Sequence, residues 1–196
     1  MIRRAKVHLV GVIWAGGTNQ MISIVAAIGK NRELGIKDKI PWHIREDLLR
    51  FKNLTLEKTV VVGRKTFESL LSYYQKSQRP FPKRNYFIVT KNADYIPDLK
   101  NVVEPEKSQF RIFKSVDEAI FEAKKNDKGE IFLIGGASIF KQGIKYANRL
   151  YLTLVDGDYP DADAYFPDYS DFKKIESEEK RSDGKYTYKF MTLSKV

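Results

Sequence analysis

The sequence predicts an α/β fold: a single domain with a mostly parallel central sheet, flanked by helices and followed by a C-terminal antiparallel hairpin. Three observations support this prediction. Short apolar runs, typical of strands buried on both faces, alternate with segments of helical spacing. The chain of 196 residues has the length of one domain. Near its end, Asp183-Gly184 is a hairpin signal, and residues 186–193 alternate as an antiparallel strand does.

The first half of the predicted domain alternates strands with helices. Residues 22–28 are apolar apart from one serine, which predicts a buried strand. Residues 31–39 are polar and contain Gly35, so they are expected to form a loop. The elements that follow are a helix at 45–54, a buried strand at 59–62 ending at Gly63, a helix from 66 to about 74, a loop at 72–83 that carries Pro80 and Pro82, and a strand at 86–90.

The second half repeats the alternation. Ser115 and Glu118 have the spacing of a capping box, which predicts a helix over 115–125. A strand at 131–134 runs directly into Gly135-Gly136. A helix at 138–146 and a strand at 149–155 complete the pattern. Ligands of parallel α/β sheets bind beyond the carboxyl ends of strands, so the site is expected where these strands pass into helices.

Composition excludes several classes of site. The chain has no cysteine and only two histidines, His8 and His43. These counts exclude a disulfide scaffold, a zinc finger, an iron–sulfur cluster, a cysteine nucleophile and a multi-histidine metal site, and no bound metal is expected. The net charge of +10 favours an anionic partner. Acidic residues are interspersed among the basic ones, which argues against a nucleic-acid-binding module.

The first twenty residues stand apart from this pattern. Arg3, Arg4 and Lys6 precede an apolar run at 7–14, which has the outline of a secretory signal. Trp14 and His8 are poor residues for such a segment. We therefore expect an N-terminal extension over 1–20 and a domain over 21–196. The alternative to a signal is an appendage from an upstream start codon, with Met21 as the functional beginning. No apolar run is long enough to cross a bilayer. We expect a cytoplasmic protein without membrane contact.

Asp47 is the residue most informative about chemistry. At about 100° per residue, Phe51 and Leu54 fall on the same side of the predicted helix as Asp47. Arg50 and Lys52 are expected to point elsewhere, so the carboxylate would be buried without a cation. Such a group suits proton transfer, or binding of a cationic heterocycle that donates hydrogen bonds. The alternative is an ordinary first-turn acid that interacts with the helix dipole.

Two strand ends have features that suit phosphate. Gly135-Gly136 lets another backbone or a phosphate approach closely, and the next helix offers free N–H groups; it could equally be a tight turn. Arg64 and Lys65 stand at a helix start, where positive charge is unfavourable, so a bound anion could compensate them. They could also be two solvated cations.

Taken together, these segments resemble the dihydrofolate reductase family. The resemblance runs from Met21 to Val196 in unbroken order, and the order and spacing of the motifs make it specific. The motifs are Met21-Ile-Ser-Ile-Val-Ala-Ala27, Leu34-Gly35, Ile40-Pro41-Trp42 with Asp47, Leu48 and Phe51, Val62-Gly-Arg-Lys-Thr-Phe-Glu-Ser69, Pro80-Phe-Pro-Lys-Arg84, Ile134-Gly135-Gly136, Tyr151-Leu152-Thr153 and Phe166-Pro167-Asp168-Tyr169.

The resemblance implies reduction of 7,8-dihydrofolate to 5,6,7,8-tetrahydrofolate with NADPH, with hydride passing to C6 and Asp47 assisting protonation of N5. Thr153 would orient Asp47, and Trp42 would hold a water. Arg84 would pair with the α-carboxylate of the glutamate tail. The remaining substrate-binding residues would be Val25, Ala26, Leu48, Phe51, Leu70 and Ile134.

The resemblance also implies an NADPH site at the two strand ends. Gly135-Gly136 resembles the family's cis peptide, residues 30–39 would form a lid over nicotinamide, and Asp163 would help to hold that lid closed. The cofactor-binding residues would be Ala27, Leu34, Gly35, Ile40, Gly63, Arg64, Lys65, Thr66, Val89, Thr90, Lys91, Gly135, Gly136, Ala137, Ser138, Ile139 and Gln142. The partner would be a small-molecule substrate, with no nucleic acid, and the protein a monomer.

One alternative shares the expected fold. The NADPH-dependent reductase of the riboflavin pathway would have the same sheet and Gly-Gly turn. It lacks the pairing of Trp42 with Asp47, and it usually accompanies a deaminase with zinc-binding cysteines, which are absent here.

Overall fold

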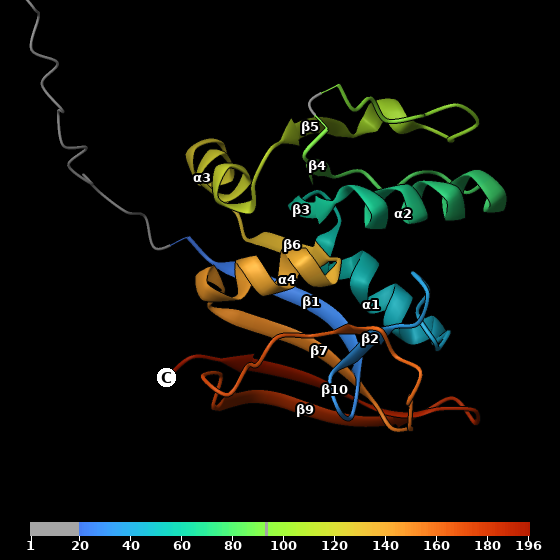
Figure 1. The fold of residues 1–196 in the computed structure, drawn as a ribbon, viewed down its shortest axis with the longest axis vertical. Helices are drawn as coiled ribbons and strands as arrows, with labels where there is room; N and C mark the ends of the chain where they lie inside the picture. The colour runs from blue at the N-terminus through green and yellow to red at the C-terminus, as the bar shows by residue number, and fades with distance from the viewer. Residues whose placement is uncertain (1–19, 93) are drawn as a thin grey trace, which may run out of the picture.

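The protein forms one eight-stranded sheet with helices on both faces (Figure 1). The computed structural model describes residues 20–92 and 94–196, so the expectations for residues 1–19 lie outside the described part. The strand order is β5-β4-β3-β6-β1-β7-β10-β9. The strands of this sheet are β1 (Ile22–Gly29), β3 (Thr59–Gly63), β4 (Asn85–Val89), β5 (Gln109–Phe113), β6 (Ile131–Gly135), β7 (Arg149–Val155), β9 (Lys174–Ser182) and β10 (Thr187–Ser194).

Six of these strands run parallel, and the C-terminal hairpin adds the antiparallel pairs. β1 lies between β6 and β7, and β3 lies between β6 and β4. β10 pairs antiparallel with both β7 and β9. The α/β fold class and the hairpin after residue 182 are therefore confirmed. The short strands β2 (Glu33–Gly35) and β8 (Ala164–Tyr165) pair outside the main sheet.

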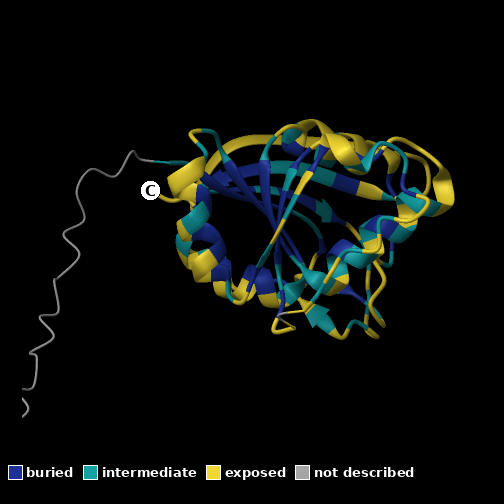
Figure 2. Cartoon of the chain, turned by 90° about the horizontal axis from the view of Figure 1, so that it is seen from above, coloured by how far each residue is buried: buried dark blue, intermediate teal, exposed yellow. Residues whose placement is uncertain are grey.

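The helices divide between the two faces because strand residues alternate. In β3, Val61 faces one apolar cluster, whereas Val60 and Val62 face another. The first cluster contains α3 (Val116–Asn126) and α4 (Ala137–Gly143), and the second contains α2 (Arg64–Ser77), with side chains of α1 (Arg45–Thr55) packed against it. Figure 2 shows buried strands at the centre and exposed residues on the outer faces of the helices.

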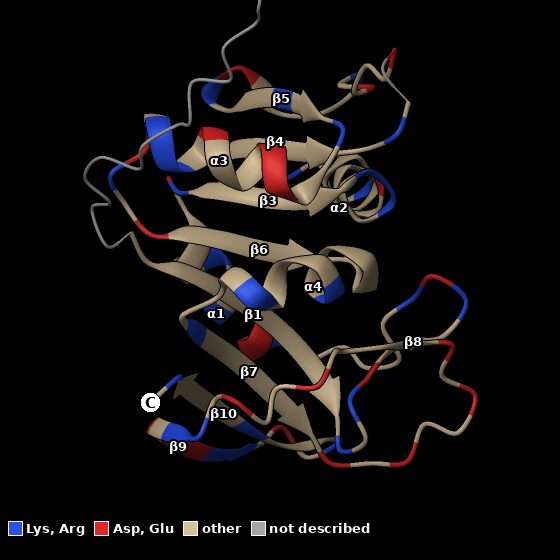
Figure 3. Cartoon of the chain, turned by 60° about the vertical axis from the view of Figure 1, so that its left-hand side comes forward, with Lys and Arg blue, Asp and Glu red and all other residues tan. Residues whose placement is uncertain are grey.

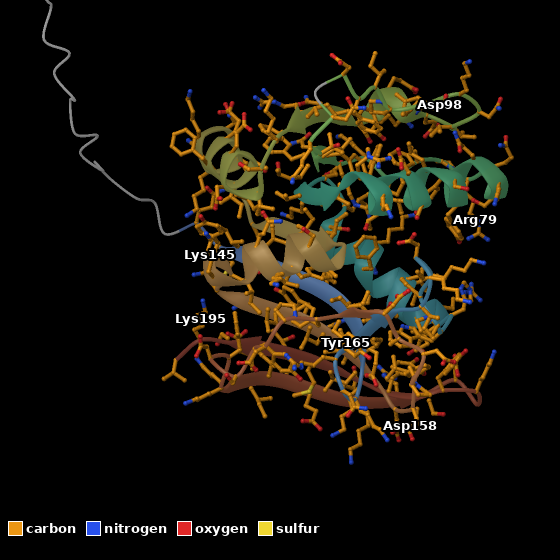
Figure 4. The ribbon with its side chains drawn as sticks, viewed as in Figure 1. Arg79, Asp98, Lys145, Asp158, Tyr165 and Lys195 are labelled. Atoms are coloured by element: carbon orange, nitrogen blue, oxygen red, sulfur yellow. The ribbon has the colours of Figure 1, made fainter. Side chains whose placement is uncertain are left out.

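Helix α2 is longer than the sequence predicts. Residues 72–77 continue the helix, so the prediction of a loop from residue 72 was wrong. Leu71 is buried, and the Tyr74 ring packs on Phe81 with their centroids 5.3 Å apart. These contacts favour helix over loop. Gln78 ends the helix in the left-handed conformation at φ 51°, and Arg79 lies beyond that end (Figure 4).

Of the two edge strands, β5 was not predicted, and β9 was implied only as the partner of residues 186–193 in the predicted hairpin. β5 has one buried residue, Phe113, and β9 is exposed along its whole length. β9 carries charges of both signs, as Figure 3 shows, and such a sequence resembles a solvated loop more than a strand. Charged side chains on an edge strand oppose pairing with other chains. The partners in β4 and β10 therefore define these strands more than their own sequences do.

The helix after Gly135-Gly136 is shorter than expected. α4 ends at Gly143, and a single 3-10 turn at Ile144–Tyr146 follows. Ser115 caps α3 as predicted, because its hydroxyl accepts the Glu118 N–H at 3.1 Å. Among the described residues, no helix has both the length and the apolar character needed to cross a membrane.

Candidate active site

Asp47 lies in the first turn of α1 and contacts the central sheet. The Thr153 hydroxyl of β7 donates to Asp47 Oδ1 at 2.5 Å. Thr153 is fully buried, so the hydrogen bond anchors a partly buried carboxylate to a rigid strand. Asp47 is thus both a first-turn acid and a group on the inward face of the helix, and the two interpretations of the sequence are compatible.

Burial decides the protonation behaviour of Asp47. Desolvation raises its pKa above the ordinary value of 3.8, while the Thr153 hydrogen bond and the charge of Arg50 lower it. Burial dominates, so the net shift is upward. A carboxyl group with a raised pKa on a cavity wall suits proton transfer.

The charge of Arg50 affects Asp47, which the helical projection did not predict. Its guanidinium donates to the backbone carbonyls of Leu152 and Met191, each at 3.3 Å. The hydrogen bonds of Arg50 therefore go to the backbone of the sheet and not to the Asp47 carboxylate. Its charge nevertheless lowers the pKa of Asp47, so the expectation of an acid without a nearby cation was wrong. The reason is that Arg50 is folded inward against the sheet, where charges are weakly screened.

A cavity of about 850 Å³ opens beside Asp47 between α1, α2 and the preceding loop. Leu48 lines it and is 40% exposed, so an apolar surface is available to a ligand. The residues around this cavity are Asp38, Lys39, Ile40, Trp42, His43, Ile44, Asp47, Leu48, Arg64, Lys65, Glu68, Ser69 and Ser72. The structure therefore brings Asp47, Trp42 and the Arg64-Lys65 pair to one opening.

Trp42 carries an unused donor at this cavity. Its ring is buried and packs edge-on against Tyr159, with centroids 4.9 Å apart. The indole Nε1 is buried and has no hydrogen-bond partner within the described chain. A buried N–H without a partner costs free energy, so a polar group of a ligand or a water is the natural acceptor.

The loop before Trp42 is fastened at two points. Asp163 accepts the Lys37 N–H at 2.9 Å, and its own N–H bonds to the Gly35 carbonyl at 3.1 Å. On the other side, Asp38 lies 3.5 Å from the Lys65 ammonium of α2. The short β2–β8 pair, in which Figure 4 labels Tyr165, supports the base of this loop. The predicted contact between Asp163 and the loop is thus present.

The second strand end has donors suited to phosphate. The Gly135-Gly136 peptide is cis, and a Cβ on Gly136 would lie 2.9 Å from the Thr66 hydroxyl. α2 and α4 both begin without a side-chain cap, after the neighbouring strands β3 and β6. Uncapped N–H groups and two adjacent glycines at the carboxyl ends of neighbouring strands fit the pyrophosphate of a dinucleotide.

The two cations at the start of α2 already have partners. Arg64 forms an ion pair with Glu68, with Nη1 and Oε2 2.8 Å apart, and Lys65 lies near Asp38. Carboxylates of the chain therefore compensate these charges, and their placement does not by itself require a bound anion. Thr90 follows β4 and is 9% exposed, and Lys91 beside it is exposed.

Three residues of α4 are less available than the sequence suggests. The Ile139 side chain is in the core, and its N–H bonds to the Gly136 carbonyl at 2.9 Å. Gln142 donates to the Ser138 hydroxyl at 2.9 Å and to its carbonyl at 3.1 Å. This leaves the N–H groups of Ala137 and Ser138 as the donors of α4 that face outward from its first turn.

Arg84 is buried and incompletely satisfied. Its Nε donates to the Thr55 carbonyl and hydroxyl, and its Nη1 donates to Tyr86 at 2.8 Å. Nη2 has no partner within the described chain. The Phe51 ring lies beneath the guanidinium, with Cζ 5.0 Å from its centroid. A fixed arginine with a free N–H is well suited to an anionic ligand such as a carboxylate.

The other predicted site residues lie on nearby elements but do not line the cavity. Val25 and Ile134 are buried in the cluster that contains α2, and Phe51 and Leu70 pack against that cluster. The rest occupy strands or strand ends: Ala26 and Ala27 on β1, Leu34 and Gly35 on β2, Gly63 at the end of β3, and Val89 at the end of β4.

Several cavity residues were missed from the sequence. Lys65, Ser69 and Ser72 recur at the spacing of one helical face, a signal that the predicted helix start at residue 66 left incomplete, because α2 begins at Arg64. Arg50 was set aside because projection on an isolated helix ignores the strands beside it. Nothing in the sequence signals that backbone carbonyls of β7 and β10 hold its side chain.

Comparison with known proteins is consistent with this geometry. A family model described as "Dihydrofolate reductase" matches residues 21–195. A dihydrofolate reductase of Buchnera aphidicola subsp. Acyrthosiphon pisum is 36% identical over 181 residues, which cover 89% of this chain and 99% of that protein. The dihydrofolate reductase type 3 of Salmonella typhimurium is 34% identical, with 89% and 98% covered.

A solved structure has the same fold. The dihydrofolate reductase from Enterococcus faecalis, complexed with NADP(H) and RAB-propyl, superposes with a TM-score of 0.70 at 27% identity. The match covers 89% of this chain and 96% of that one.

Proposed function

The chain belongs to the dihydrofolate reductase family and reduces 7,8-dihydrofolate to 5,6,7,8-tetrahydrofolate with NADPH, and on this premise we propose which residues carry the reaction. The observation that carries the proposal is the Asp47–Thr153 hydrogen bond at the wall of the cavity. It joins a carboxyl group of raised pKa to a rigid, buried strand. The riboflavin-pathway alternative is not retained, because the matching family and relatives are dihydrofolate reductases.

Asp47 binds the pterin and favours its protonation. Its carboxylate accepts hydrogen bonds from N3 and the 2-amino group, and its negative charge stabilises positive charge as N5 takes up a proton from solvent. Thr153 fixes the carboxylate through the 2.5 Å hydrogen bond, so less reorganisation is needed when the substrate binds. Trp42 holds a water through its unpartnered Nε1.

NADPH, when bound, supplies the hydride to C6 of the pterin. The chain contributes the position of the two reactants and the exclusion of water. Ala137, Ser138 and Gly136 contact the pyrophosphate through backbone, and Arg64, Lys65 and Thr66 meet phosphates from α2. The remaining contacts proposed for the cofactor come from Ala27, Leu34, Gly35, Ile40, Gly63, Val89, Thr90, Lys91, Gly135, Ile139 and Gln142.

Arg84 binds the glutamate tail of the substrate. Its free Nη2 and the adjacent Nη1 match the two oxygens of an α-carboxylate, and Thr55 and Tyr86 hold the guanidinium in place. Between Arg84 and Asp47, the apolar surface for the pterin and benzoyl rings comes from Val25, Ala26, Leu48, Phe51, Leu70 and Ile134.

Several coarser features of the protein are also proposals. The catalytic domain spans residues 21–196, with residues 1–20 as an extension, as the family match over 21–195 supports. The enzyme acts as a cytoplasmic monomer on a small-molecule substrate, without nucleic acid. The interspersed charges of both signs in Figure 3 support the last point.

A pair of variants tests the central contact. Thr153→Val removes the hydroxyl and should lower kcat/KM for dihydrofolate roughly ten- to a hundredfold, because a buried hydrogen bond to a charged group contributes about 1.5–3 kcal/mol. Thr153→Ser keeps the hydroxyl and should retain activity within about threefold. NADPH oxidation followed by absorbance measures both. A loss in Thr153→Ser with none in Thr153→Val would show that packing of the threonine methyl, and not its hydrogen bond, matters.

A further inference from the structure

Arg50 is a partly buried cation one helical turn beyond Asp47. Its Nη1 donates to the Leu152 carbonyl and its Nη2 to the Met191 carbonyl, each at 3.3 Å. The guanidinium also lies over the Phe190 ring, with Cζ 4.7 Å from the centroid. Both hydrogen-bond acceptors are neutral, so these bonds hold the positive charge in place without cancelling it.

These contacts fasten α1 at the position where Asp47 meets the sheet. Leu152 immediately precedes Thr153 in β7, and Met191 of β10 pairs with Leu152 across the two strands. Phe190, beneath the guanidinium, pairs with Thr153. Arg50 thus holds α1 against Leu152, the neighbour of Thr153 in β7, and against Met191, the partner of Leu152 in β10.

We propose that Arg50 is a positioning residue that sets the pH range of hydride transfer, by holding a fixed positive charge beside the Asp47–pterin unit and so disfavouring its uptake of a proton. The inference rests on the proposed role of Asp47. The overall reaction consumes one proton: dihydrofolate, NADPH and H⁺ give tetrahydrofolate and NADP⁺. A nearby cation opposes binding of that proton whether it resides on Asp47 or on N5.

The direction agrees with the electrostatics of the ligand-free chain. The charge of Arg50 lowers the pKa of Asp47 against the larger effect of burial. In return, Asp47 raises the pKa of Arg50, which burial lowers. Charges interact more strongly where water is partly excluded, so an inward cation has more effect than one in solvent.

Other charged groups surround the same region. Glu46 of α1 accepts a hydrogen bond from Tyr188 of β10 at 2.8 Å, while Tyr151 of β7 and Glu179 of β9 interact with Arg50. The titratable and charged groups that line the same cavity as Asp47 are Asp38, Lys39, His43, Arg64, Lys65 and Glu68. None of the groups in these two sets contributes to the pKa shift of Asp47, whereas Arg50, packed against the sheet, lowers that pKa.

Two neutral variants test the proposal. Arg50→Gln keeps a donor for one carbonyl, and Arg50→Met keeps an apolar side chain over Phe190, so one folded variant suffices; circular dichroism checks the fold. Single-turnover hydride transfer is measured from about pH 5.5 to pH 9.5 with saturating NADPH and dihydrofolate. The midpoint of the pH profile should move to higher pH, and the rate near pH 9 should exceed that of the parent protein about threefold.

Two control variants separate the effect of the buried charge from that of packing. Arg50→Lys keeps the charge and should keep the midpoint. Arg45→Gln removes an exposed cation from the first position of α1 and should also leave the midpoint in place, because solvent screens that charge. The inference is overturned if the neutral variants lower the rate equally at every pH, or if either control moves the midpoint as far as they do.

The variant Asp47→Asn tests the proposed function separately from the role of Arg50. If that variant keeps the parental pH profile, then Asp47 does not assist protonation and the proposed function itself fails. If Asp47→Asn changes the profile but the neutral Arg50 variants do not, only the inference about Arg50 fails.

Discussion

The charges at the substrate end of the site are partly buried, whereas those at its phosphate end are more exposed and paired with each other. At the substrate end, Asp47 is partly buried, bonded to a buried threonine, and approached by a guanidinium that is itself held by carbonyls. At the phosphate end, Arg64 and Lys65 are paired with carboxylates of the chain, and the Lys65–Asp38 pair is largely exposed. Buried charges depend on each individual partner, whereas exposed ones are screened and replaceable.

This contrast has a consequence for the effects of mutation. Single substitutions at the substrate end should have large effects that depend on pH. Substitutions at the phosphate end should have smaller effects, since uncapped backbone N–H groups of α2 and α4 share the binding with side chains.

Asp47→Asn should have the largest effect. We expect a loss of hydride transfer of roughly a hundredfold or more at pH 7, since general acid–base assistance contributes about 10²–10⁴-fold. The loss should shrink at acid pH, where solvent protonates the substrate more readily. Single-turnover rates at about pH 5.5 and pH 7 measure this. Parental activity at pH 7 would remove Asp47 from the mechanism and end the contrast between the two regions.

Arg84→Lys tests the far side of the substrate end. Lysine keeps the charge but cannot donate two parallel hydrogen bonds, so KM for dihydrofolate should rise roughly tenfold or more, equivalent to about 1.5–3 kcal/mol. A pterin without the glutamate tail serves as the matched substrate and should show little change in KM. A uniform rise for both substrates would mean that Arg84 acts through the fold, by way of Thr55 and Tyr86.

Arg64→Ala should have a smaller effect at the phosphate end. Arg64 must leave Glu68 to bind a phosphate, which reduces its net contribution to binding. We expect NADPH affinity to fall about five- to tenfold and NADH affinity to change less, because NADH lacks the 2′-phosphate. Dissociation constants from fluorescence titration of both cofactors decide this. Equal losses for the two cofactors would show that Arg64 does not contact the 2′-phosphate.

The smallest expected effect concerns the stability of the ligand-free protein. Burial raises the pKa of Asp47, so the folded state binds a proton more readily than the unfolded state does. Its contribution to stability is therefore greatest below the ordinary value of 3.8 and declines as pH rises through the raised pKa. At pH 7, Asp47→Asn should melt at the same temperature as the parent protein or a few degrees higher. A clear drop in Tm would show that the carboxylate stabilises the fold.

The sequence alone was sufficient for the main architecture and for the family. Buried strands such as residues 22–28 and 59–62 need apolar side chains on both faces, and this requirement leaves a continuous apolar run that can be seen without a structure. The capping box at Ser115 and Glu118 is equally local, and it forms as predicted. Asp47 was identified because one carboxylate interrupts an apolar helical face.

The tertiary structure decided what depends on contacts between distant segments. Thr153 lies 106 positions from Asp47, and Arg50 lies 102 and 141 positions from the residues whose carbonyls it binds. The ion pair of Arg64, the free N–H of Arg84 and the edge strand β5 likewise follow from neighbours that are distant in the chain or a turn away on a helix. Periodicity records which face of an element is buried. It does not record which polar group that face meets, because that partner is chosen only when the strands and helices pack together.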